Sequence, residues 1–172
     1  MFGTDGTLAL LPTRPAALAL DFDGVMTDNR VLVTQDGTES VACDRGDGMG
    51  IERLRRAGLP VVVLSKEANP VVAARCAKLR VPCVQGLEDK ATALRAWLDE
   101  QGIDPADVVF LGNDVNDAEC LQAVGCGVVV GDAHAAVRPL ARITLDAVGG
   151  RGAVRELSDL IEKKLALFEA RS

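Results

Sequence analysis

The chain alternates short apolar runs with amphipathic stretches, and this alternation constrains its fold more than any other feature. Five apolar runs of five to eight residues have the composition of buried strands, at 17–21, 60–65, 81–86, 107–114 and 126–132. Stretches with apolar residues at helical spacing follow or separate them, at 47–59, 69–81, 90–103, 117–125 and 152–168. Alternating strands and helices form a parallel sheet whose right-handed crossovers place helices on both faces. We therefore predict a three-layer, Rossmann-like α/β domain.

The size and charge of the chain narrow its possible partners. With 172 residues, 48% of them hydrophobic, the chain can bury one core, so we predict a single domain over residues 1–172. The net charge of −6 argues against a nucleic acid or an anionic membrane as the main partner. No apolar run approaches a membrane span, and the N-terminus lacks the pattern of a secretion signal. We expect a cytoplasmic protein that begins with a loose lead over residues 1–15.

One segment departs from the alternation of strands and helices. Residues 30–43 contain two β-rich arms around Asp36-Gly37. An Asp-Gly pair between such arms is a strong signal for a tight hairpin turn. Because this segment follows the first predicted strand, we predict a β-hairpin that leaves the sheet at that point.

Cysteine and histidine chemistry is disfavoured by composition. The five cysteines include no Cys-x-x-Cys pair, and His134 is the single histidine of the chain. This argues against a zinc site and against a Cys/His nucleophile pair, and it favours reduced cysteines that pack as small apolar residues. Carboxylates, hydroxyls and lysine remain as the groups that could carry out a reaction.

Polar residues gather where the predicted strands end. In an open parallel sheet the ligand binds outside the carboxyl ends of the strands. Four separate loops place polar side chains at that edge, and these side chains belong to Asp21, Asp23, Ser65, Lys90, Asn113, Asp114 and Asp117. Taken alone, Ser65 or Asp114 could simply cap a helix, and Lys90 could be a solvated helix residue. Together they form an oxygen-rich set that suits Mg²⁺ with a bound phosphate.

This set of side chains can transfer a phosphoryl group. With Mg²⁺ screening the charge, Asp21 can attack phosphorus, and Asp23 can protonate the leaving oxygen and later activate water. Ser65 and Lys90 would bind the phosphoryl oxygens and stabilise the charge that spreads over them. The sequence therefore favours a phosphatase.

Four motifs in this order resemble those of the haloacid dehalogenase superfamily of phosphohydrolases. They are Asp-x-Asp-Gly-Val-x-Thr-Asp at 21–28, Ser65 after an apolar strand, Lys90, and Gly-Asn-Asp-x-x-Asp at 112–117. The resemblance spans about residues 16–165. It implies that Asp21 is the nucleophile and that Asp23 is the general acid/base, which also offers a carbonyl to Mg²⁺. It further implies that Asp114 is a metal ligand and Asp117 a supporting acid beside Lys90.

The short intervals between the motifs leave no room for a cap domain, as in the capless branch of the superfamily. Within that branch the chain resembles the phosphatases of 2-keto-3-deoxy sugar acids, which act on the octulosonate 8-phosphate or on a nine-carbon 9-phosphate. It also resembles the phosphatase-like domain of acylneuraminate cytidylyltransferases. The second motif, Ser65-Lys66-Glu67, is more similar to the nine-carbon group than to the Thr-Gly-Arg of the octulosonate enzymes. The branch implies a homotetramer that its hairpins assemble.

Four further side chains are candidates for contact with the sugar: Glu67, Arg45, Asp47 and Arg151. Each has an ordinary structural alternative. Glu67 could be an exposed acid at a helix start, Arg45 and Asp47 an ordinary loop with a helix cap, and Arg151 a linker arginine.

Two alternatives to a sugar phosphate phosphatase come from other classes. A non-catalytic assembly module would keep the fold and use the hairpin to form tetramers, but such a module has no need for the acids and Lys90. A phosphoaspartate receiver also has acids at strand ends, a hydroxyl and a lysine. Receivers lack an acid two residues after the acceptor and the Gly-Asn-Asp-x-x-Asp set, and both are present in this chain.

Overall fold

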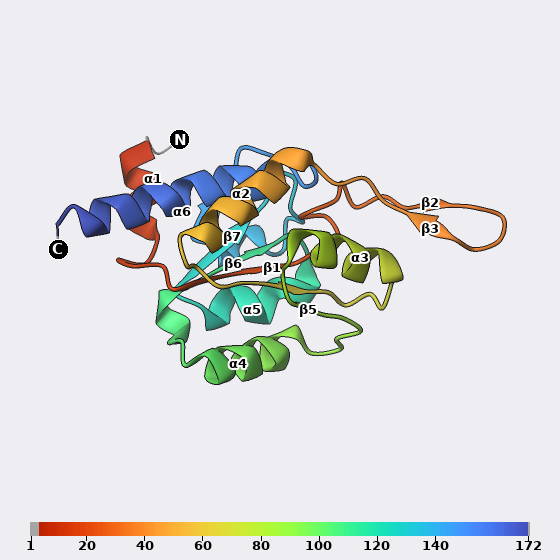
Figure 1. The fold of residues 1–172 in the computed structure, drawn as a ribbon, viewed down its shortest axis with the longest axis horizontal. Coiled ribbons are helices and arrows are strands. Elements are labelled where there is room, and N and C mark those ends of the chain that lie inside the picture. Colours follow the sequence, from red (N-terminus) through yellow and green to blue (C-terminus); the bar gives the residue numbers. More distant parts are fainter. Residues whose placement is uncertain (1–3, 172) are drawn as a thin grey trace.

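The computed structural model describes residues 4–171. Its centre is a six-stranded parallel sheet in the order β5-β4-β1-β6-β7-β8 (Figure 1). In chain order these strands are β1 (Ala17–Leu20), β4 (Val61–Leu64), β5 (Cys83–Val84), β6 (Val108–Gly112), β7 (Cys126–Val129) and β8 (Ile143–Thr144). The chain runs from β1 outward through β4 to β5 and then returns to β6 on the other side of β1. The order thus reverses between β1 and β6, where ligands bind in sheets of this kind.

Helices cover both faces of the sheet. They are α1 (Thr4–Leu10), α2 (Arg45–Arg56), α3 (Pro70–Leu79), α4 (Lys90–Gln101), α5 (Ala118–Ala123) and α6 (Ala153–Glu169). Helices α2 and α6 lie side by side on one face, and α4 and α5 on the other (Figure 1). The predicted three-layer α/β fold without a cap domain is therefore confirmed. Within residues 4–171, no helix combines the length and apolar character that crossing a membrane requires.

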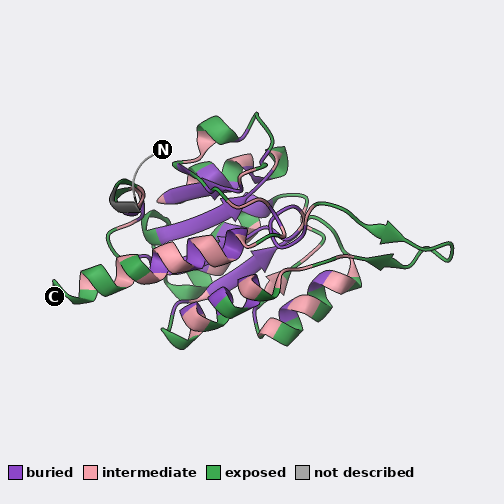
Figure 2. Ribbon diagram, turned by 90° about the horizontal axis from the view of Figure 1, so that it is seen from above, coloured by how far each residue is buried: buried purple, intermediate pink, exposed green. Residues whose placement is uncertain are grey.

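The core lies between the sheet and its two helical layers. Every residue of β1, β4, β6 and β7 is buried, whereas the helices bury one side each (Figure 2). Strands covered on both faces read as continuous apolar runs rather than as an alternation, and this property made them visible in the sequence.

The sixth strand, β8, is absent from the predicted set. It has two residues and pairs with β7 through Val128 and Ile143 at the edge of the sheet. Thr144 is exposed, so the segment lacks the apolar run that marks the inner strands. A short edge strand leaves too little pattern for periodicity to detect.

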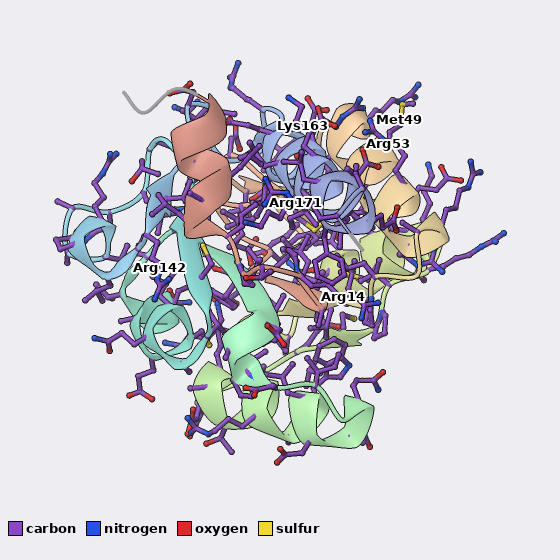
Figure 3. The ribbon with its side chains drawn as sticks, turned by 90° about the vertical axis from the view of Figure 1, so that its left-hand side faces the viewer. Arg14, Met49, Arg53, Arg142, Lys163 and Arg171 are labelled. Carbon is purple, nitrogen blue, oxygen red and sulfur yellow. The ribbon has the colours of Figure 1, made fainter. Side chains whose placement is uncertain are left out.

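The predicted loose lead over residues 1–15 is wrong for its described part. Helix α1 begins at Thr4 and packs on α6, with Leu8 and Leu11 buried and Lys164 Nζ donating to the Leu8 carbonyl at 2.9 Å. Residues 1–3 lie outside the described part. Figure 3 shows this end of the molecule, where the guanidinium of Arg14 lies 5.7 Å from the ring centroid of Phe168. A seven-residue helix gives only a weak local sequence signal, and the burial of these two leucines stabilises it.

The hairpin is confirmed. Strands β2 (Leu32–Val33) and β3 (Glu39–Ser40) pair antiparallel, and Gly37 has the positive φ of +83° that the turn between them requires. Every residue from 30 to 40 is exposed, and the ribbon projects away from the sheet (Figure 2).

Candidate active site

Asp21 and Lys90 form a buried ion pair at the carboxyl edge of the sheet. Asp21 directly follows β1, and Lys90 is the first residue of α4. Lys90 Nζ lies 2.7 Å from Asp21 Oδ1, and the Phe22 N–H donates to the same oxygen at 2.7 Å. The side chains of Asp21 and Lys90 are 4% and 2% exposed. Because both contacts engage Oδ1, Oδ2 is the Asp21 oxygen available to a ligand.

Asp117 connects Lys90 to the loop that follows β6. Lys90 Nζ donates to Asp117 Oδ1 at 2.8 Å, while Oδ2 accepts from the backbone N–H groups of Asn113 at 2.8 Å and Asp114 at 3.3 Å. Gly112 permits this arrangement, since a Cβ there would lie 2.7 Å from that of Asp117. The predicted supporting acid is therefore placed to fix both the lysine and the loop that carries Asp114.

Burial shifts the pKa values of this ion pair. Burial and the neighbouring Asp117 raise the pKa of Asp21 well above its usual range, although Lys90 opposes them. For Lys90, burial alone would lower the pKa, but Asp21 and Asp117 outweigh it and the pKa is raised. The lysine therefore remains a cation at neutral pH and favours the ionised form of Asp21.

Asp23 lies two residues further along the same loop and is half-buried. Burial is the main cause that raises its pKa, followed by the negative charge of Glu67, while Lys90 lowers it and Glu39 raises it. A carboxyl with a raised pKa holds its proton closer to neutral pH, which suits a general acid. Asp21 and Asp23 thus occupy different electrostatic environments despite their proximity in sequence.

Local hydrogen bonds fold the loop over residues 22–28. The Phe22 carbonyl accepts from the Met26 N–H at 2.8 Å, and Thr27 Oγ1 accepts from the Gly24 N–H at 3.1 Å. Gly24 has φ +81°, and a Cβ there would lie 1.9 Å from Asn113 Nδ2. The glycine after the acid pair is therefore required both by the turn and by the close approach of Asn113.

Ser65 and Glu67 follow β4 beside the hairpin. Ser65 is buried, and its hydroxyl accepts from the Glu67 N–H at 3.2 Å and contacts the Glu67 carbonyl at 3.3 Å. Its contact with a phosphoryl oxygen remains a prediction. Glu67 is exposed and lines a cleft of about 760 Å³ between the hairpin and α3.

Arg45 and Arg151 are exposed. Arg45 is the first residue of α2, and Arg151 lies just before α6, next to glycines that contact the 22–28 loop. Their contact with substrate remains a prediction.

Asp47 is not placed as a substrate-contacting residue. Its carboxylate is buried between α2 and α6, and Oδ1 accepts from the Arg155 N–H at 2.8 Å. It therefore binds the N-terminal end of α6, whose own N-cap residue Gly152 makes no side-chain cap. The sequence pattern suggested contact with the sugar because the pairing of α2 with α6, which lie far apart in sequence, cannot be read from either helix alone.

Sequence reasoning missed Glu39, which reaches the site from the hairpin. Its carboxylate accepts a hydrogen bond from the Asn69 side chain, lines the cleft with Glu67 and raises the pKa of Asp23. The hairpin itself could be predicted, but its direction relative to α3 could not, so no sequence signal pointed to Glu39.

The side chains at this edge fit a hard cation. Asp21 and Asp114 follow the adjacent strands β1 and β6, and the Asn113 amide oxygen is buried with no hydrogen-bond partner among residues 4–171. The described residues hold no cluster of three or more His, Cys, Asp or Glu side chains that could bind a metal. Mg²⁺ needs no such cluster, because one or two carboxylates suffice when water and substrate phosphate supply the other ligands.

Comparison with known proteins gives consistent results. The haloacid dehalogenase-like hydrolase family matches residues 84–156. A 3-deoxy-D-manno-octulosonate 8-phosphate phosphatase from Salmonella typhi is 35% identical over 145 residues, 84% of this chain and 77% of the relative.

Solved structures agree with the sequence comparison. The same phosphatase from Moraxella catarrhalis, in complex with magnesium, phosphate and KDO, superimposes with a TM-score of 0.90 at 26% identity and covers 98% of this chain and 97% of its own. A Streptomyces avermitilis protein is 48% identical with a TM-score of 0.85, over 88% of this chain and 87% of its own. That protein is assigned only to the HAD hydrolase family, with no substrate named.

The fold, the Asp21–Lys90–Asp117 cluster and these relatives agree with one another. Phosphatases of this family use Mg²⁺, for which the oxygen ligands at the sheet edge are suited. The relatives named for their activity are sugar acid phosphate phosphatases. The chain therefore belongs to the haloacid dehalogenase-like hydrolases and is a capless phosphatase of that family.

Proposed function

We propose that this chain is a Mg²⁺-dependent phosphomonoesterase that hydrolyses a 2-keto-3-deoxy sugar acid phosphate through an aspartyl-phosphate on Asp21. The observation that carries this proposal is the buried contact of Lys90 with both Asp21 and Asp117, with Asp23 two residues further along the loop. An inert module would not retain two buried carboxylates on one buried lysine, because such a cluster is costly unless it serves a purpose.

In the first step, Asp21 Oδ2 attacks phosphorus and the bond from phosphorus to the sugar oxygen breaks. Asp23 donates its proton to that oxygen, so the sugar leaves as a neutral alcohol. Lys90 holds Asp21 through Oδ1 and, with Ser65, binds the phosphoryl oxygens as charge spreads over them. When bound to Asp21, the Asp23 carbonyl and Asp114, Mg²⁺ would supply positive charge that favours ionised Asp21 and screens its repulsion with the phosphate.

In the second step, Asp23 removes a proton from water, and the resulting hydroxide attacks phosphorus. The bond between Asp21 and phosphorus breaks, phosphate leaves and Asp23 is again protonated. Because one carboxyl gives and then takes the proton, its pKa has to lie close to the working pH, and burial with Glu67 and Glu39 shifts it in that direction.

The nine-carbon 9-phosphate is our first candidate substrate. Its support is the Ser65-Lys66-Glu67 motif and the position of Glu67 in the cleft between the hairpin and α3, from which its charge raises the pKa of Asp23. Octulosonate 8-phosphate is the second candidate, because relatives at 34–35% identity are named for it. Exposed apolar residues on the hairpin support assembly into a homotetramer. In such a tetramer, the hairpin of a neighbouring subunit would close this cleft.

Phosphate release tests this proposal. We would measure Mg²⁺-dependent release from both sugar acid phosphates and from simple hexose phosphates, with Asp21→Asn as the blank and the exposed Asp99→Asn as the matched control. We expect a preference of about a hundredfold in kcat/KM for one sugar acid, equal to about 2.7 kcal/mol in the transition state. Full activity in Asp21→Asn would refute the covalent mechanism. Negligible release by a folded tetramer would instead support the assembly module.

A further inference from the structure

A segment remote in sequence crosses the loop that carries Asp23. Residues 146–152, here called the strap, connect β8 to α6. Glu156 in the first turn of α6 accepts from the N–H groups of Asp146 at 3.2 Å and Ala147 at 2.8 Å. Asp132 accepts from the Gly149 N–H at 2.9 Å, and the Gly131 N–H donates to the Ala147 carbonyl at 2.9 Å. The strap is thus fastened to the rest of the domain at its first two residues and at Gly149.

Two glycines make the crossing possible. A Cβ on Gly149 would lie 2.0 Å from the Gly24 carbonyl oxygen, and a Cβ on Gly150 would lie 2.5 Å from the Asp28 nitrogen. No side chain fits at these distances, so the two backbones are in direct contact. The Gly150 N–H also donates to the Val25 carbonyl at 2.9 Å.

The contacts of the strap begin at Gly24, the residue after Asp23, and involve neither Lys90 nor Ser65. They involve Gly24, Val25, Thr27 and Asp28 of the 22–28 loop. The contacts of Lys90 and Ser65, by contrast, come from other elements, namely Asp21, Asp117 and the Glu67 backbone. The strap can therefore affect the direction of Asp23 while the contacts of Lys90 and Ser65 with their own partners stay in place.

We infer that Gly149 and Gly150 are positioning residues for Asp23, because the strap fixes the backbone of the 22–28 loop and thereby aims this carboxyl. The inference rests on the proposed role of Asp23 as general acid/base. It assigns to the Gly-Gly-Arg-Gly segment a role in the rate of proton transfer, whereas the sequence alone offered for its Arg151 either substrate contact or a place in a linker.

The test compares Gly150→Ala with Gly102→Ala. Gly150 has φ +68° and Gly102 φ +65°, so both alanines strain the backbone alike, but a Cβ on Gly102 meets nothing within 4 Å. We expect Gly150→Ala to lower kcat for the sugar phosphate at least about tenfold, while KM and inhibition by inorganic phosphate change less than about twofold. Gly102→Ala should leave all three values near those of the wild type.

A second readout separates positioning from general loss of structure. Para-nitrophenolate leaves without needing a proton, so formation of the aspartyl-phosphate from para-nitrophenyl phosphate should survive in Gly150→Ala while its hydrolysis slows. We expect a burst of about one equivalent of para-nitrophenolate, as accumulation of a covalent intermediate produces. Should Gly150→Ala not fold, Glu156→Gln loosens the strap without adding atoms, and we expect the same burst.

The outcomes distinguish this inference from the proposed function. If Gly150→Ala matches Gly102→Ala in kcat, or if folded Gly150→Ala and Glu156→Gln show no burst, the inference is overturned. If Asp23→Asn retains wild-type kcat, the role of Asp23 fails and the inference fails with it. An inactive Asp23→Asn together with a fully active Gly150→Ala would overturn the positioning role alone.

Discussion

Asp47 shows how the burial of one carboxyl makes stability depend on pH. One of its oxygens accepts from the Arg155 N–H, and the other has no partner among the described residues. Burial raises the pKa of Asp47 to about 6, and Asp44 adds to this, although the Arg155 N–H and Arg75 oppose the shift. The folded protein therefore binds the proton more tightly than the unfolded chain, whose Asp47 has the ordinary pKa of 3.8.

From this shift we predict that the free energy of unfolding of the wild type, minus that of Asp47→Asn, falls as pH rises. The stabilising contribution is fully present below pH 3.8 and is lost as pH rises through the folded pKa of about 6. The shift of about two units corresponds to about 3 kcal/mol. Urea unfolding of both proteins between pH 4 and 7.5 measures the difference.

Asp99→Asn removes a carboxylate from the exposed surface of α4 and serves as the control for Asp47→Asn in the same unfolding series. A difference for Asp47→Asn that stays constant or grows with pH would show that its carboxyl is not buried as described.

Individual site residues could be predicted where a strand end determines their position. Asp21 and Asp117 belong to loops that leave the carboxyl ends of neighbouring strands, so the location of ligand sites at that edge was enough to group them with Lys90. Asp47 and Glu39 depend instead on how α2 packs against α6 and on where the hairpin points. Both are long-range arrangements that local sequence patterns do not encode.

At the scale of elements, the hairpin has too little structure to hold itself together. Val31, Leu32 and Val33 are 52%, 68% and 57% exposed, and an isolated two-stranded ribbon is marginally stable in water. Three consecutive exposed apolar residues mark a surface that a partner covers. We therefore predict that the wild type forms a homotetramer through this hairpin and that Leu32→Asp yields smaller species, as light scattering after size exclusion would show.

Leu167→Asp provides the control for the hairpin variant. Leu167 is 45% exposed near the C-terminal end of α6, and that end of the helix lies on the opposite side of the molecule from the hairpin (Figure 1), so its substitution should leave the assembly unchanged. A monomeric wild type, or a Leu32→Asp variant that remains tetrameric, would contradict assembly through the hairpin.

The elements that sequence analysis missed or misjudged share a physical cause. Helix α1 has seven residues and β8 has two. Elements this short gain little from local propensity and are stabilised by packing, α1 on α6 and β8 on β7. The long helices α2 and α6 bury a clear apolar side, so periodicity detected them, although their pairing appears only in the structure. That pairing includes the contact of Arg53 with Glu162 at 2.8 Å on the side of the molecule seen in Figure 3.

At the scale of the whole molecule, the proposed cation site joins loops from the two central strands, so we predict that Mg²⁺ stabilises the entire domain. Asp21 follows β1 and Asp114 follows β6, and both strands lie in the middle of the sheet. A ligand that binds only the folded state at a hundred times its Kd adds about 2.7 kcal/mol. For a domain of this size that raises Tm by about 5–10 °C. Scanning calorimetry with Mg²⁺ and with a chelator measures the shift.

Asp114→Asn should lose most of the shift, because one of the two carboxylates is gone, while the remote Asp99→Asn should keep it. Equal shifts in Asp114→Asn and the wild type would mean that the cation binds elsewhere, and no shift at high Mg²⁺ concentration would mean that the folded domain binds Mg²⁺ no more tightly than the unfolded chain does.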